Sequence, residues 1–233
     1  AALLPESLVE AKSLAGSKCE HAWRTQSPAN DWQVFSANLK EVVKLSREEA
    51  RLRADAKGCT PYEALLDLFE PDMTSARLDG LFGDMKTWLP DLLTRVVEKQ
   101  SQHAFVPPQG PFPTAVQREL GLEAMKMLGF DFNAGRLDVS AHPFCGGVPE
   151  DVRITTRYDE DELLSALFGV VHETGHARYE QNLPRNWLGQ PIALARSTAI
   201  HESQSLFFEM QLGRSDAFLK HLLPAVHARF GSQ

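Results

Sequence analysis

The feature that most constrains this sequence is the pentapeptide HETGH, His172 to His176, which lies in the middle of the helical stretch LLSALFGVVHETGHARYEQ. Residues four apart project from the same face of an α-helix, so both imidazoles can reach one cation while Glu173 stands beside them. A motif of this form arises by chance in about one chain in a hundred of this length. The alternative is a helix whose two histidines point into solvent or bond to polar neighbours. We favour a metal site in which His172 and His176 are ligands and Glu173 acts on the attacking water.

A third protein ligand has to come from elsewhere, because catalytic zinc usually has three and leaves the fourth position to water. The metzincin pattern requires a histidine six residues after His176, but that residue is Asn182, so this class is excluded. The helix expected from about residue 191 to 212 contains His201 and Glu202. Neighbouring side chains point about 100° apart around a helix, so only one of the pair can face the metal squarely. Spacing favours Glu202, and an ordinary surface glutamate is the alternative.

Helical patterns dominate the first half of the chain. Apolar residues recur at three- and four-residue spacing from residue 4 to about 100. Pro90 is expected to kink the helix over residues 74–99 or to split it in two. The stretch 103–114 is rich in proline and is expected to be a loop, with a further helix over 113–128.

The pattern changes after residue 129. The segments FDFNAGRLDVSAHPF and DVRITTRY alternate and are rich in β-branched and aromatic residues, which predicts strands. Helical patterns return over 159–181 and 191–212. We therefore predict a mainly α protein with a small β-sheet next to the HExxH helix. The predicted layout is one domain over residues 1–233, with a helical part (1–129), a small sheet (130–158) and metal-site helices (159–213).

Composition and charge exclude several classes of partner. The net charge of −7 and the absence of a dense Lys/Arg cluster argue against nucleic acid. No apolar run approaches the roughly 20 residues needed to span a bilayer, and the opening residues lack the pattern of a signal peptide. We therefore expect a cytoplasmic protein with no nucleic-acid or membrane partner.

Cysteine and serine chemistry is not indicated either. The three cysteines are widely spaced and form no CxxC pair, which fits reduced thiols and excludes a cysteine-based zinc site. The sequence has no GxSxG motif, and Cys145 has no partner histidine at a recognisable spacing. Hydrolysis without a covalent intermediate is therefore favoured.

Four short motifs follow one another along the chain: HPF at 142–144, DxRxT at 151–155, HETGH at 172–176 and HESQ at 201–204. This set resembles the carboxypeptidase Taq family of metallocarboxypeptidases. The resemblance implies a mostly helical, gluzincin-like metallopeptidase fold, a metal held by His172, His176 and Glu202, and Glu173 as general base. Members of that family are longer and carry IRxxAD and GxxQDxHW segments that are absent here. We therefore expect a piece of a longer protein, with the groups that bind the substrate's terminal carboxylate in the missing part.

The first two motifs supply candidate substrate-binding residues. Side chains alternate along a strand, so Asp151, Arg153 and Thr155 are expected to share one face. One interpretation is an edge strand beside the active site that helps to hold the peptide, and the other is an Asp/Arg pair that braces the sheet. His142 can likewise border the site or serve as a structural hydrogen-bonding residue at a strand end.

The favoured function is a metal-dependent carboxypeptidase that acts on peptides with a free C-terminus, as the resemblance implies. A gluzincin endo- or oligopeptidase stays open, because HExxH with a distant glutamate does not decide where a peptide is cut. A non-catalytic metal-binding helical fragment is the third interpretation. One Zn²⁺ is the expected cofactor, although such a ligand set also accepts Co²⁺ or Mn²⁺. Homodimer formation is left open.

Overall fold

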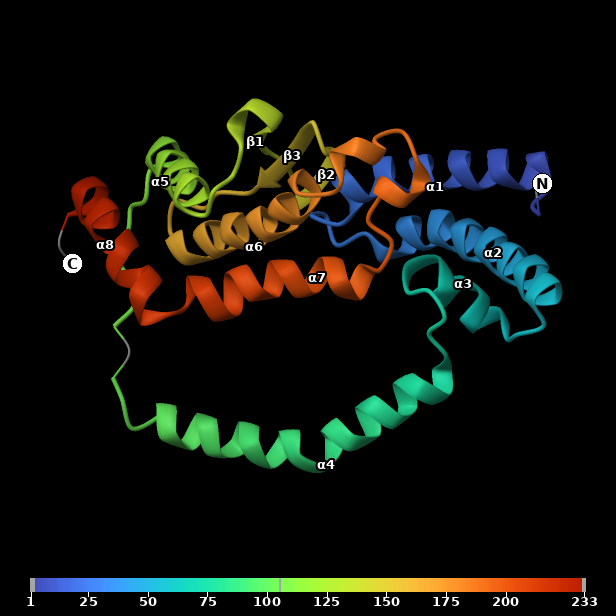
Figure 1. Ribbon diagram of the computed structural model, residues 1–233, viewed down its shortest axis with the longest axis horizontal. Coiled ribbons are helices and arrows are strands. Elements are labelled where there is room, and N and C mark those ends of the chain that lie inside the picture. Colours follow the sequence, from blue (N-terminus) through green and yellow to red (C-terminus); the bar gives the residue numbers. More distant parts are fainter. Residues whose placement is uncertain (1–2, 105, 232–233) are drawn as a thin grey trace. The chain divides into compact units, whose positions relative to one another are not determined.

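The computed structural model describes residues 3–104 and 106–231, and most of them are helical (Figure 1). The chain divides into two compact units, one up to Ser101 and one from Gln102 onward. Each unit is described here by itself. The expectation of a mainly α protein with a small sheet is confirmed, and the expectation that residues 1–233 form one domain stays a prediction. Among the described residues, no helix is long and apolar enough to cross a membrane.

The described residues of the first unit, 3–101, form four helices. They are α1 (Glu6–Gln26), α2 (Trp32–Lys57), α3 (Pro61–Phe69) and α4 (Ser75–Gln100). Helix α2 ends at Gly58, whose φ of 70° is a left-handed conformation that glycine adopts without strain. Helix α3 begins with a reciprocal cap in which Thr60 accepts from the Glu63 backbone and Glu63 accepts from the Thr60 backbone. Helices α1 and α2 pack together, and the buried Glu49 of α2 is ion-paired with Lys12 and Arg53.

Helix α4 runs through Pro90 without splitting. Its ribbon bends partway along its length (Figure 1). Proline removes one backbone donor and crowds the preceding turn, which bends a helix but need not end it. Of the two outcomes expected at Pro90, the structure has one continuous helix.

The second unit carries the candidate site. Its regular elements are α5 (Thr114–Met127), β1 (Gly135–Val139), β2 (Phe144–Val148), β3 (Asp151–Thr156), α6 (Leu163–Gln181), α7 (Thr198–Leu206), the π-helical segment η4 (Phe207–Gly213) and α8 (Asp216–Phe230). Short 3-10 turns occur at Phe132–Ala134, Arg185–Trp187 and Pro191–Ala193. The expected proline-rich loop is irregular up to Pro113 where it is described, and Phe105 lies outside the described residues. The predicted boundary after residue 129 falls inside this unit, because α5 packs against α6.

The sheet has three strands in the order β1-β3-β2. Strand β1 runs parallel to β3, and β2 runs antiparallel to it. Ile154 of β3 therefore pairs with Leu137 on one side and Cys145 on the other. Of the two interpretations of the DxRxT segment, the one that makes it an edge strand is wrong, because β3 is central and β2 is an edge. Burial explains the position, since Val152 and Ile154 are fully buried.

Helix α6 is the element around which this unit packs. One apolar cluster joins its residues Leu167 and Val171 to α5 and α8, and another joins Val170 and Ala177 to the sheet. Two neighbouring residues thus belong to different clusters, so α6 is apolar on two sides rather than along one stripe. Glu162 caps the N-terminus of the helix, and its carboxylate accepts from the backbone N–H groups of Leu164 and Ser165. Its core contacts fix the position of the HETGH segment.

Helices α6 and α7 lie side by side, and Gly175 allows them to approach (Figure 1). A Cβ atom at Gly175 would lie 2.6 Å from Ser205 Cα and 2.7 Å from Gln204 O. Real Cβ atoms essentially never come this close to backbone atoms. The glycine of HETGH therefore has a packing role that the spacing of the motif alone does not reveal.

We predict that Gly175→Ala lowers the free energy of unfolding by about 1–3 kcal/mol, because the added methyl group pushes two backbones apart. Gly169→Ala is the matched control, since it lies on the same helix and its added Cβ would meet no atom within 4 Å. This control is expected to be neutral or to stabilise by up to ~1 kcal/mol, because alanine favours helix more than glycine does. Chemical denaturation of the two variants and the wild type is the measurement. Equal stabilities of the two variants would contradict the close approach.

Candidate metal centre

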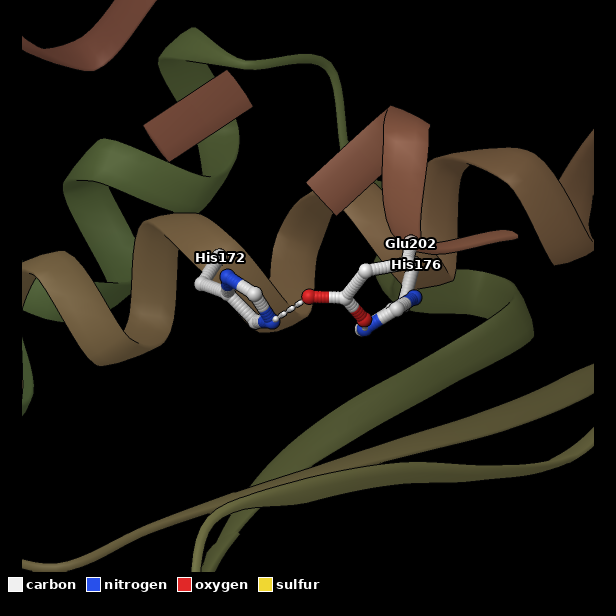
Figure 2. Close-up of side chains that lie close together, drawn as sticks. All are labelled: His172, His176 and Glu202. Carbon is white, nitrogen blue, oxygen red and sulfur yellow. Dashed lines mark ion pairs between the residues drawn. The ribbon is translucent and has the colours of Figure 1, made fainter. Parts of the chain in front are cut away.

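Three predicted ligands converge in the second unit. His172 and His176 lie one turn apart on α6, and Glu202 reaches them from α7 (Figure 2). His172 Nε2 is 3.6 Å from Glu202 Oε1, and His176 Nε2 is 3.3 Å from Glu202 Oε2. One potential ligand atom from each residue lies within 4.8 Å of the other two. The structure thus brings together the three residues that sequence spacing selected.

The donor set fits a divalent transition metal. Two imidazole nitrogens and one carboxylate oxygen form a standard ligand set for catalytic zinc. Donor atoms bound tetrahedrally at about 2.0–2.1 Å lie about 3.3 Å apart, which is close to the two nitrogen-to-oxygen distances measured here. The Glu202 side chain is 45% exposed, so the site is open on one side.

His201, the competing ligand, points to the other side of the His176 ring. His201 Nδ1 lies 2.6 Å from His176 Nδ1, whereas Glu202 lies near His176 Nε2. His201 Nε2 lies 2.8 Å from Glu180 Oε1. Adjacent residues on α7 thus face different sides of one imidazole, as the 100° rotation per residue requires.

The His172 ring is also held through Nδ1, the ring nitrogen that does not face Glu202. Its Nδ1 lies 3.0 Å from Glu209 Oε2, and Arg214 Nη2 donates to Glu209 Oε1 at 2.7 Å. Burial alone would raise the pKa of Glu209, but hydrogen bonds from Arg214 and His172 outweigh burial and keep the pKa below its usual value. The sequence analysis missed Glu180, Glu209 and Arg214. A signal was present for two of them, because Glu180 follows His176 by four residues and Glu209 follows Glu202 by seven, which places each pair on a common helix face.

Glu173 is only 7% exposed although it is a carboxylic acid. Burial raises its pKa to about 7, the charge of Glu202 adds to the rise, and the neighbouring His172 opposes it. Burial also lowers the pKa of His176 to about 4, so this ring is neutral at neutral pH. A neutral imidazole is the form that binds a metal.

A hollow of about 390 Å³ opens beside these residues. Glu173, His176, His201 and Glu202 line one part of it. The remaining lining residues lie around the start of β2 and around the start of α7: Pro143, Phe144, Cys145, Ala195, Arg196, Ser197 and Thr198. Burial raises the pKa of the Cys145 thiol to about 12, and the charges of Glu173 and Glu180 add to the rise. The thiol is therefore protonated at neutral pH, which argues against a cysteine nucleophile.

The predicted substrate-binding residues lie outside this lining. Asp151 and Arg153 form an exposed ion pair, with Arg153 Nη2 2.7 Å from Asp151 Oδ2. Thr155 Oγ1 donates to the backbone oxygen of His142 and accepts from the backbone N–H of Phe144, each at 3.1 Å. These bonds hold the start of β2, whose Phe144 lines the hollow. The contacts favour the structural interpretation, and substrate binding by Asp151, Arg153, Thr155 and His142 stays a prediction.

A mainly helical fold with a sheet beside an HExxH helix, and a glutamate supplied by the following helix, is the arrangement of a metallopeptidase. The match to a family model is specific: the model described as carboxypeptidase Taq (M32) metallopeptidase matches residues 1–233. The chain belongs to this family, and the resemblance carried by its four motifs is confirmed.

Similarity to individual proteins extends over nearly the whole chain. It is 39% identical to thermostable carboxypeptidase 1 of Thermus thermophilus, over 98% of this chain and 46% of the relative. It is 38% identical to carboxypeptidase 1 of Bacillus subtilis, over 92% of this chain and 43% of the relative. The solved structure of Trypanosoma cruzi metallocarboxypeptidase 1 matches with 51% identity and a TM-score of 0.86, over 99% of this chain and 47% of that one. The chain thus spans about half the length of the relatives it matches.

The raised pKa of Glu173 predicts a specific dependence of stability on pH. Its folded-state pKa of about 7 lies above the ordinary value of 4.5, so the folded protein binds more protons than the unfolded one between these values. Stability contributed by the protonated carboxyl is therefore lost as pH rises from about 4.5 through 7. In metal-free protein, Glu173→Gln is expected to gain stability relative to wild type between pH 5.5 and pH 8. Denaturation curves at both pH values measure the difference in free energy of unfolding between the variant and the wild type. A difference of the same size at both pH values would contradict the raised pKa.

Proposed function

We propose that this protein is the metal-binding part of a metal-dependent carboxypeptidase, which hydrolyses C-terminal residues from peptides with a free C-terminus. One observation carries the proposal: three side chains of metal-ligating types converge next to the buried carboxyl of Glu173, at the edge of an open hollow. Membership of the carboxypeptidase Taq family and the names of its relatives support this reaction over others.

The proposed ligands are His172, His176 and Glu202, and the proposed ion is one Zn²⁺, with Co²⁺ or Mn²⁺ as alternatives. When bound, such an ion supplies Lewis-acid chemistry and lowers the pKa of water. The protein's part is to present neutral imidazole nitrogens and one carboxylate. The lowered pKa of His176 suits this role, because no proton has to be displaced from its ring at neutral pH.

Glu173 is the proposed general base. Its carboxylate takes a proton from the attacking water, and the resulting carboxylic acid gives that proton to the departing amine. A group that serves in both directions works best when its pKa lies near the working pH, and burial moves the pKa of Glu173 toward neutrality. With a divalent cation bound beside it, Glu173 would have a lower pKa and would be present more fully as the base before attack.

Two alternative functions use the same residues. A gluzincin endo- or oligopeptidase needs the same ligands and base, and a non-catalytic metal-binding fragment needs only the ligands. The carboxypeptidase names of the relatives favour neither alternative. A cytoplasmic location and a homodimer stay predictions, as does the absence of nucleic-acid and membrane partners.

Two substitutions are expected to separate metal binding from proton transfer. Glu202→Ala removes a ligand, so it should lose most of the bound metal and the hydrolysis together. Glu173→Gln should keep the metal but lower kcat by at least about 10²–10⁴-fold, because an amide cannot accept the water's proton. Elemental analysis after dialysis and a peptide hydrolysis assay are the two measurements. Near wild-type turnover by Glu173→Gln would reject the base, and full metal content in Glu202→Ala would reject the ligand.

Peptides that differ only at the C-terminus distinguish the reactions. A carboxypeptidase is expected to release the last residue from a peptide acid and to leave the matching C-terminal amide intact. Mass spectrometry of both digests under equal metal loading identifies the bond that is cut. Internal cleavage of both peptides would support the endopeptidase instead. Stoichiometric metal without cleavage of either peptide, by the complete natural chain as well as by this 233-residue chain, would support the non-catalytic interpretation.

A further inference from the structure

His176 and His201 share a hydrogen bond between two ring nitrogens of the same type. The distance from His176 Nδ1 to His201 Nδ1 is 2.6 Å, so one nitrogen has to carry the hydrogen and the other has to present a lone pair. The two possible directions have opposite consequences. If His176 Nδ1 carries the hydrogen, the lone pair of the neutral ring is on Nε2, toward Glu202. If Nδ1 has the lone pair, the hydrogen is on Nε2 instead.

Glu180 decides between the two directions. Its Oε1 lies 2.8 Å from His201 Nε2, and an ionised carboxylate can only accept a hydrogen bond. A His201 ring that donates from Nε2 to Glu180 and has one hydrogen presents its lone pair at Nδ1. In that arrangement His176 donates from Nδ1 and keeps its own lone pair on Nε2, at the atom that lies 3.3 Å from Glu202 Oε2.

We propose that His201, oriented by Glu180, is a positioning residue for His176 and not a metal ligand: the His201–Glu180 pair fixes the tautomer and ring orientation in which His176 can bind a divalent cation. This inference rests on the metal site of the proposed function. It assigns a role to His201, the alternative to Glu202 as the third ligand, because the two neighbours act on opposite sides of the His176 imidazole.

The packing of His201 supports a fixed orientation. Its side chain is 21% exposed and that of Glu180 is 22% exposed, so water competes weakly for their hydrogen bond. The Tyr179 ring meets the His201 ring edge-on, with 5.0 Å between the ring centroids. Glu180 and His176 are one turn apart on α6, so the ring of His201, from α7, is clamped between two residues of the neighbouring helix.

The two proposed ligand histidines are held in different ways. His172 has the Glu209 carboxylate directly on its Nδ1, whereas His176 reaches a carboxylate only through a second imidazole. Outer hydrogen bonds of this kind orient a metal-bound histidine, and their loss typically weakens metal binding by about 10–100-fold. The His201–Glu180 pair should therefore change metal affinity without supplying a bond to the metal.

The test measures the Zn²⁺ dissociation constant by competition with a chelator in wild type, Glu202→Ala, His201→Ala, His201→Asn and Glu180→Ala. His201→Ala is expected to weaken binding by about 10–100-fold, clearly less than Glu202→Ala. His201→Asn should recover most of the affinity, because its side-chain oxygen can accept from His176 Nδ1–H. Ser203→Ala is the control, since this exposed hydroxyl donates within α7 to Ile200 O, and it should leave affinity unchanged.

Double substitution tests whether Glu180 acts through His201. Glu180→Ala is expected to weaken Zn²⁺ binding in the wild-type background and to have no further effect in His201→Ala. Visible absorption of the Co²⁺-loaded variants should report a changed ligand geometry in both single variants. Denaturation curves without metal verify that each variant folds. If His201→Ala does not fold, the Zn²⁺ affinity of His201→Asn is measured instead.

Several results would overturn the inference. Loss of binding in His201→Ala as complete as in Glu202→Ala, without rescue by Asn, would make His201 a ligand. Unchanged affinity in His201→Ala, or additive losses in the double variant, would remove the positioning role. These outcomes differ from failure of the proposed function: wild type that binds no Zn²⁺ removes the site and this inference together. If the wild type binds Zn²⁺ with an affinity that depends on His201 but cleaves no peptide, only the proposed peptidase activity is rejected, and the inference about His201 stands.

Discussion

The contact between α6 and α7 at Gly175 is the constraint on which the candidate site depends. Two of the proposed metal ligands lie on α6 and the third on α7, so the distance between the helices sets the distance between their potential donor atoms. Gly175 lies between His172 and His176 in sequence and meets the backbone at Ser205, three residues beyond Glu202. A side chain there would separate the helices at the level of the site. The HETGH motif therefore encodes a helix contact as well as two proposed ligands.

Burial of α6 on two sides makes this arrangement rigid and also has an electrostatic cost. Val170 and Val171 anchor the helix in two apolar clusters just before His172. The same burial surrounds Glu173 and His176 and disfavours the charged form of each. The apolar packing that positions the site therefore also produces its titration behaviour.

Helical periodicity predicted the main elements and the common face of His172 and His176, because spacing of three to four residues defines a helix face. For Glu202, spacing left an ordinary surface glutamate as an alternative, and the family resemblance implied its place in the ligand set. Contacts between distant segments were not predictable in this way. Arg214 and Glu209 approach His172 only through the packing of η4 against α6. The edge position expected for the DxRxT strand was wrong, since alternation reports which face is buried but not which strand lies in the middle. Metal binding itself stays a prediction.

Glu173 and Glu209 both lie near His172 and have the same side chain, but their surroundings shift their pKa values in opposite directions. Glu209 accepts hydrogen bonds from Arg214 and His172, which outweigh its burial and favour the ionised form. Burial raises the pKa of Glu173 to about 7, because the attraction of His172 is too weak to offset the effect of burial. An ionised Glu209 can hold the His172 ring without competing for protons, while Glu173 can gain and lose a proton near neutral pH. These surroundings suit the roles proposed for the two residues, with Glu209 orienting the His172 ring and Glu173 transferring a proton.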